Sequence, residues 1–214
     1  MRIFRFLTGI SGGVFLTTSL LVINIFQTSS LVILPLSRRK FRAFNRFCAN
    51  TWWGWCVIYA ERFQGVHVVI TGDAIPQDEN AILVANHRDY SDIVMLLCLG
   101  ARKSRLGDMK WFVKDVLKYL PGVGWGMLFL DCIFVERNWT ADRYSVEKTF
   151  AKVKKNHIPI WLMSFLEGTR LTPKKLEASQ RHMARLNLTP ANHVMFPRTK
   201  GFVPAHRVLG HTRE

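Results

Sequence analysis

The hydrophobic and polar positions of this chain divide it into two regions. The first holds an apolar run from Phe6 to Leu36 that contains no charged residue. A transmembrane helix needs about 20 apolar residues, so this run fits one tilted span or two helices that only partly enter a bilayer. The polar residues at 28–30 interrupt the run, which favours a helix-turn-helix embedded in one leaflet. A cleaved signal peptide is a weaker alternative, because the run is too long and lacks a clear small-residue cleavage site.

A basic and aromatic segment follows the apolar run. Its cations are Arg38, Arg39, Lys40, Arg42 and Arg46. Positive charge gathers on the cytoplasmic side of a membrane, so we expect the remaining chain to be cytoplasmic. Trp and Tyr are frequent over 41–63 and favour the headgroup level, which predicts an interfacial helix that can also pack on a core. Residues 1–64 are therefore expected to anchor a second domain, 65–214.

The second region alternates short apolar runs with amphipathic stretches. Strands are expected at 66–71, 81–85, 111–114, 132–135, 159–165 and 194–196. Helices are expected at 93–99, 140–155 and from Pro173 to about Leu188, the last opened by Thr172-Pro173 as cap and first helical residue. This alternation predicts an α/β fold in which a mixed sheet is flanked by helices.

Charge and cysteine usage narrow the partners of the chain. The formal net charge of +15 implies an anionic partner, which could be nucleic acid, a membrane surface or a phosphorylated substrate. The apolar N-terminal region and the lack of a nucleic-acid motif argue against nucleic acid. The four cysteines show no CxxC pair and no metal-ligand spacing, so we interpret them as buried thiols in a reducing compartment.

Polar residues follow the expected strands. Asn86 and His87 come directly after 81–85, and Asp92 lies five residues beyond His87. A His beside a carboxylate is the minimal general-base unit. Cations and carboxylates follow the later strands at Arg137, Glu167, Arg170, Arg198 and Lys200. If these strand ends share one edge of the sheet, they surround one site suited to a phosphate, and Gly168 lets backbone approach the ligand. With a membrane anchor, this combination suggests acyl transfer onto the hydroxyl of a phosphorylated lipid.

Four segments of the chain resemble the motifs of the glycerolipid acyltransferases. They are Asn86-His87-x4-Asp92, the segment 133–137 (IFVER), the segment 165–170 (FLEGTR) and the segment 196–202 (FPRTKGF). They occur in order over roughly 66–203, and Leu166 stands where that family has proline. The resemblance implies a glycerol-3-phosphate acyltransferase-like fold whose N-terminal helices embed in one leaflet.

The resemblance also implies roles for individual residues. His87 would be the general base, and Asp92 would orient and polarise it. The implied substrate-binding residues are Asn86, Lys114, Arg137, Glu167, Gly168, Thr169, Arg170, Pro197 and Lys200. Among them, Arg137 and Arg170 would hold the acceptor's phosphate, and Pro197 and Lys200 would lie near acyl-CoA or phosphate. Glu167 could instead be a structural cap paired with Arg170. No metal or cofactor is expected, and acyl-CoA would be the co-substrate.

The expected protein is a membrane-bound acyltransferase of phospholipid biosynthesis, in the endoplasmic reticulum membrane with a cytoplasmic catalytic domain. Its expected acceptor is 1-acylglycerol-3-phosphate, giving phosphatidic acid, with lysophosphatidylinositol or lysocardiolipin as alternatives. The chain stops twelve residues after Phe202, where the family pattern continues. A C-terminally truncated form that is catalytically inactive and only binds membranes is therefore a further alternative.

Overall fold

The computed structural model describes residues 2–136, 138–199 and 202–209. The chain divides into two compact units, and each is described by itself. The first unit comprises Met1–Glu79 and Ile93–Glu136, and the second comprises Asn80–Asp92 and Arg137–Glu214. The boundary at residue 65 that the sequence suggested stays a prediction.

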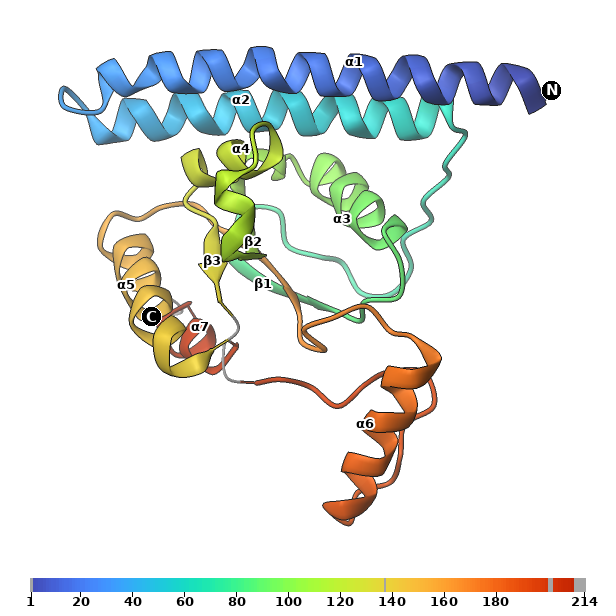
Figure 1. The fold of residues 1–214 in the computed structure, drawn as a ribbon. Coiled ribbons are helices and arrows are strands. Elements are labelled where there is room, and N and C mark those ends of the chain that lie inside the picture. Colours follow the sequence, from blue (N-terminus) through green and yellow to red (C-terminus); the bar gives the residue numbers. More distant parts are fainter. Residues whose placement is uncertain (1, 137, 200–201, 210–214) are drawn as a thin grey trace. The chain divides into compact units, whose positions relative to one another are not determined.

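A helical hairpin opens the first unit. Helix α1, Arg2–Ser29, takes up most of the apolar run and passes into a short 3-10 turn, η1, Ser30–Ile33. Helix α2, Arg38–Ile58, begins where the Ser37 side chain accepts a hydrogen bond from the Lys40 amide, and it ends in a π-helical turn, η2, Tyr59–Phe63. Figure 1 shows α1 and α2 lying side by side. The apolar run therefore forms one long helix, and its partner is the basic, aromatic segment.

Three polar contacts join the second arm of the hairpin (α2 and η2) to the first arm (α1 and η1), and we call them the ladder contacts. The donors and their acceptors are Asn45 with the Ser30 hydroxyl (3.0 Å), Trp52 with the Leu16 carbonyl (3.1 Å) and Tyr59 with the Thr8 carbonyl (3.0 Å). The three donors stand seven residues apart, two on α2 and Tyr59 at the start of η2, and so share one helix face. The segment Thr8–Ile33 is long and apolar enough to cross a membrane.

The rest of the first unit surrounds a pair of parallel strands. Its elements are α3 (Ser91–Arg102), η3 (Leu106–Asp108), β2 (Met109–Lys114), η4 (Asp115–Tyr119), α4 (Val123–Phe129) and β3 (Ile133–Val135). The first two residues of α3, Ser91 and Asp92, belong to the second unit. Strand β2 pairs with β3, with Phe112 opposite Ile133. Met109 and Ile133 are almost fully buried, so this pair forms part of the core.

Two of the five cations that follow the apolar run are engaged inside the first unit. Arg46 pairs with the buried Asp108 at 2.5 Å, and Arg42 pairs with Asp131 at 3.4 Å. The exposed cations at this end of α2 are Arg38, Arg39 and Lys40. The positive charge available to a lipid surface is therefore smaller than the sequence suggests.

The second unit contains the other parallel pair of strands. Its elements are β1 (Ala81–Ala85), α5 (Trp139–Lys155), β4 (Trp161–Phe165), α6 (Pro173–Arg185) and α7 (Phe202–Leu209). Strands β1 and β4 pair in parallel, and Ala85 lies opposite Phe165. Because both strands end at the same edge, the loop after β1 and the turn after β4 are neighbours. Helix α5 packs against α7 and contributes the buried Val146 and Phe150 to the core.

The α/β prediction is confirmed, and both described strand pairs are parallel. Two expected strands do not form. The segment 66–71 is irregular, with Val69 83% exposed. The segment 194–196 is also irregular, because the amides of Met195 and Phe196 donate to the side chains of Glu167 and Ser179 and not to a neighbouring strand. Residues Phe202–Leu209 form helix α7, an element that the sequence did not predict. The Thr172 cap of α6 is confirmed, since its hydroxyl accepts from the Lys175 amide.

Candidate active site

The loop after β1 and the turn after β4 form the candidate site within the second unit. The amide of Leu171 donates to the carbonyl of His87 at 2.8 Å, which ties the turn to the loop. The imidazole of His87 stacks on the Phe165 ring, with centroids 4.1 Å apart and an interplanar angle of 17°. The last residue of β4 therefore supports the candidate base from one face.

His87 is oriented by Asp92, which lies in the first turn of α3. Nδ1 of His87 is 2.9 Å from Oδ2 of Asp92, and the same oxygen accepts the amides of Arg88 at 2.7 Å and Asp89 at 2.9 Å. Partial burial works to raise the pKa of Asp92, but the hydrogen bonds from His87 and the two amides outweigh it and lower that pKa. An ionised Asp92 keeps the proton on Nδ1, so Nε2 is the nitrogen that can accept a proton from a substrate.

The side chain of Glu167 contacts the loop that carries His87. Its Oε2 accepts the His87 amide at 3.2 Å, and its Oε1 accepts the Met195 amide at 3.1 Å. The neighbouring Leu166 carbonyl accepts the Arg198 amide at 2.6 Å. The segments that the sequence singled out around 87, 167 and 197 are thus joined by hydrogen bonds.

The turn after β4 continues with the glycine, threonine and arginine of the third segment. Gly168 has φ +68°, and a Cβ there would lie 3.0 Å from Cδ of Arg198. The Thr169 hydroxyl accepts from Nζ of Lys175 at 2.6 Å. The guanidinium of Arg170 lies over the Tyr90 ring, 4.1 Å from its centroid. The guanidinium of Arg170 therefore lies against the loop that carries His87.

The remaining predicted site residues stand apart from these contacts or outside the described chain. Asn86 is exposed between β1 and His87, and Pro197 is exposed beside Arg198. Lys114 is the exposed last residue of β2 in the first unit. Arg137 and Lys200 lie outside the described residues. All of the predicted roles stay predictions.

Sequence reasoning did not single out Tyr90 or Met195. Tyr90 stands inside the first motif at a position without an obvious chemical role, so only its contact with Arg170 marks it. Met195 contributes through its backbone amide, which leaves no trace in a residue pattern. Across the described ranges, no group of three or more His, Cys, Asp or Glu side chains could hold a metal ion.

A family model described as Acyltransferase matches residues 67–204, which is more than half of the chain. This chain belongs to the acyltransferase family. The match covers the His87 loop, the turn after β4 and the 195–198 segment, so the geometry above is that of an acyltransferase domain.

Curated relatives of this acyltransferase carry a consistent name. "1-acyl-sn-glycerol-3-phosphate acyltransferase 2" of Brassica oleracea is 35% identical over 198 residues, covering 90% of this chain and 51% of that protein. "1-acyl-sn-glycerol-3-phosphate acyltransferase delta" of Rattus norvegicus is 32% identical, covering 85% and 49%. The chain thus spans about half the length of these relatives. The crystal structure of the 1-acyl-sn-glycerophosphate (LPA) acyltransferase PlsC from Thermotoga maritima aligns with 24% identity and a TM-score of 0.45, covering 78% of this chain and 65% of that one.

Proposed function

We propose that this acyltransferase moves a fatty acyl group from acyl-CoA to the free hydroxyl of 1-acylglycerol-3-phosphate, giving phosphatidic acid. The observation that carries the proposal is the contact between Nδ1 of His87 and Oδ2 of Asp92 at 2.9 Å, in a domain of this family. A His–Asp pair supplies a general base for a hydroxyl nucleophile. The thioester of acyl-CoA is already activated, so direct attack by that hydroxyl suffices.

The proposed reaction uses one proton transfer in each direction. Nε2 of His87 takes the proton of the acceptor hydroxyl while the oxygen of that hydroxyl attacks the carbonyl carbon of the thioester. Asp92 stabilises the imidazolium that forms, since its Oδ2 already accepts from Nδ1. The C–S bond then breaks, and the CoA thiolate takes the proton from His87. The products are the ester and free CoA, and the base is regenerated.

The choice of acceptor rests on two observations. The relatives are named for 1-acyl-sn-glycerol-3-phosphate, and Arg170 presents a guanidinium beside the loop of His87. Guanidinium groups bind phosphate through paired N–H donors. Lysophosphatidylinositol and lysocardiolipin also carry phosphate, so they belong in the assay as competing acceptors.

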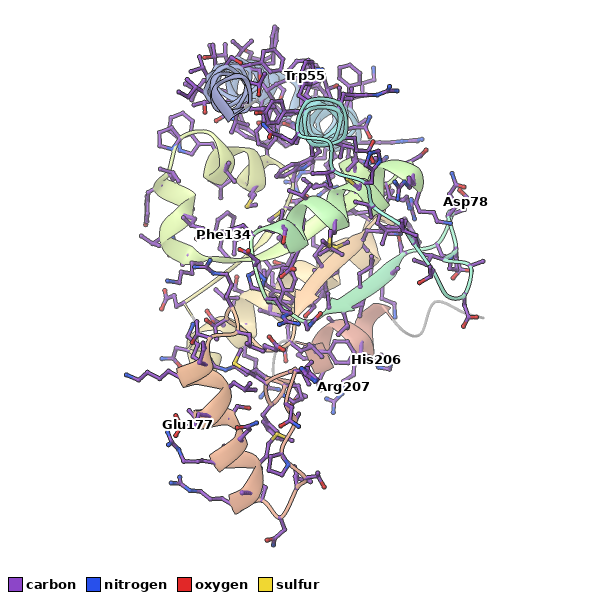
Figure 2. The ribbon with its side chains drawn as sticks, turned by 90° about the vertical axis from the view of Figure 1, so that its right-hand side faces the viewer. Trp55, Asp78, Phe134, Glu177, His206 and Arg207 are labelled. Carbon is purple, nitrogen blue, oxygen red and sulfur yellow. The ribbon has the colours of Figure 1, made fainter. Side chains whose placement is uncertain are left out.

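Membrane association is proposed from the hairpin. Large apolar side chains of α1 and η1 are exposed, among them Val14, Ile25 and Val32, which are 62%, 65% and 73% accessible. Figure 2 places Trp55 in the hairpin, and its ring lies against Phe15 at a centroid distance of 5.8 Å. An exposed apolar helix beside aromatic residues and the cations 38–40 fits insertion into a leaflet. The endoplasmic reticulum membrane with a cytoplasmic catalytic domain is the proposed location.

The test is acyl transfer from labelled oleoyl-CoA in membranes that contain the full chain. Wild type is compared with His87→Ala and with His206→Ala, an exposed histidine on α7 (Figure 2) that serves as the matched control. Loss of a general base costs roughly 100- to 10,000-fold in rate. We expect that loss for His87→Ala, full activity for His206→Ala, and the highest rate with 1-acylglycerol-3-phosphate. A folded, membrane-bound wild type without transfer to any acceptor would leave only the membrane-binding alternative.

A further inference from the structure

Glu167 lies where three segments of the second unit meet. Its side chain is only 5% exposed, and each of its two oxygens accepts a backbone amide. One amide belongs to His87 and the other to Met195, at 3.2 Å and 3.1 Å. Both carboxylate oxygens of Glu167 are therefore already hydrogen-bonded to the backbone of the protein itself.

The contacts around Glu167 reinforce this connection. Leu166 accepts the Arg198 amide on one side of Glu167, and Leu171 donates to the His87 carbonyl on the other. Neither 86–87 nor 195–198 lies in a helix or a strand. The amides of His87, Met195 and Arg198 therefore find in this turn the partners that regular structure supplies elsewhere.

We propose that Glu167 is a positioning residue that fixes the backbone of His87, so that Nδ1 meets Asp92 and the ring rests on Phe165. The proposal deepens the proposed function, on which the kinetic part of its test rests. The alternative is direct contact between Glu167 and the substrate. That role is electrostatically unfavourable beside a phosphate, because a carboxylate and a phosphate repel each other. Two backbone donors satisfy the buried carboxylate without any substrate.

The kinetic test uses Glu167→Gln, which keeps the shape of the side chain but replaces one acceptor oxygen by an NH2 donor. One of the two amide bonds is then lost and the loop of His87 shifts. A misplacement of about 1 Å can cost about 100-fold in rate, so kcat should fall roughly 10- to 100-fold while KM for 1-acylglycerol-3-phosphate stays unchanged. A raised KM at constant kcat would show substrate contact and overturn the proposal.

The matched control is Glu177→Gln. Glu177 is an exposed glutamate on α6 (Figure 2), paired with Arg181 at 2.7 Å in the same unit. The chemical change is the same, but no backbone amide near His87 depends on it. This variant should keep the wild-type kcat and KM.

Amide hydrogen exchange of the full-length chain in detergent gives a reading that needs no activity. With fragmentation to single amides, the amides of His87 and Met195 should exchange more slowly than their intrinsic rates in wild type and in Glu177→Gln. Glu167→Gln should lose protection at one or both of them. Unprotected amides in wild type, or unchanged protection in Glu167→Gln, would overturn the proposal.

The two readings separate this proposal from the proposed function. Protected amides in a wild type that transfers no acyl group would overturn the acyltransferase reaction and leave the hydrogen bonds of Glu167 standing. If Glu167→Gln does not fold, the exchange rates of His87 and Met195 in wild type still decide whether these bonds exist.

Discussion

The guanidinium of Arg170 lies 4.1 Å from the centroid of the Tyr90 ring. Tyr90 belongs to the loop that carries the proposed base, His87. Arg170, the proposed phosphate-binding residue, belongs to the turn after β4, so this contact joins the two segments. A guanidinium stacked on a ring keeps its N–H edge in one plane, which suits a phosphate approaching from the side.

Tyr90→Ala should therefore raise KM for 1-acylglycerol-3-phosphate and leave kcat nearly unchanged. An exposed cation–π contact is worth about 0.5–1 kcal/mol, which corresponds to roughly a two- to five-fold change in KM. Tyr90→Phe keeps the ring and should behave as wild type. The control is Tyr144→Ala on α5, which removes an exposed ring 5.7 Å from Nζ of Lys148. Steady-state kinetics with varied acceptor would decide, and equal KM values for Tyr90→Ala and wild type would contradict the prediction.

The bonds to Asp92 predict a pH-dependent stability. The pKa of Asp92 is lowered in the folded protein, so the ionised group stabilises the fold above its unfolded pKa of about 3.9. That contribution is lost as the pH falls through the lower, folded pKa. The free energy of unfolding of Asp92→Asn should therefore lie below that of wild type at pH 5–7, and the two should converge below about pH 4.

Thermal unfolding in detergent from pH 3 to pH 7 measures this difference. Asp78→Asn is the control for loss of a charge alone, since Asp78 is an exposed aspartate of the first unit (Figure 2). A wild type and an Asp92→Asn variant that stay equally stable at neutral pH would show that the bonds to Asp92 add nothing to the fold.

Gly168 and Gly65 form a matched pair that separates backbone strain from a local contact. Their φ values are +68° and +69°, but of the two only Gly168 has a described neighbour within 4 Å of where a Cβ would lie, namely Arg198. Alanine at either site should cost about 1–2 kcal/mol from left-handed backbone alone. Gly168→Ala should also displace Arg198 and the turn, and lower kcat/KM roughly 10-fold beyond the effect of Gly65→Ala.

Melting curves and transfer assays on both variants would check this expectation. Equal losses of activity in the two would mean that the space beside Gly168 is not needed for the reaction.

Gly12 and Gly13 provide the same kind of comparison in the hairpin. A Cβ at Gly12 would overlap the Tyr59 ring, whereas none of the described atoms lies within 4 Å of a Cβ at Gly13. Alanine favours a helix over glycine by about 1 kcal/mol, so Gly13→Ala should stabilise the protein slightly. Gly12→Ala should destabilise it by about 1–3 kcal/mol through overpacking. Opposite shifts of the thermal midpoint in detergent are expected, and a stabilised Gly12→Ala would contradict the fit of Tyr59 against α1.

The sequence predicted most reliably those elements whose signals are local. The run 81–85 is bounded by polar residues and forms β1 with the expected limits, and Thr172-Pro173 opens α6 as a cap and a first helical residue. His87 and Asp92 could be paired from sequence because five residues of loop and helix start bring them together.

Features that depend on distant partners could not be predicted in this way. The apolar residues at 194–196 resemble a strand, yet two of their amides bond to the side chains of Glu167 and Ser179. Arg42 and Arg46 resemble lipid-facing cations, yet each meets an aspartate more than 60 residues away in the chain. A residue pattern identifies the hydrogen-bond donor or the charged side chain, but not the distant partner that it contacts.

The ladder contacts also determine how the two hairpin helices can change together. A shift of α2 and η2 by one turn would separate Asn45, Trp52 and Tyr59 from their acceptors at the same time, so sliding of one arm along the other would break all three hydrogen bonds together. Each ladder contact also couples one site on the second arm of the hairpin to one site on the first. The effects of substitutions at Asn45 and Ser30 on the free energy of unfolding should therefore be non-additive with each other. They should be additive with the effects of substitutions at Tyr59 and Thr8, whose contact lies near the other end of the hairpin.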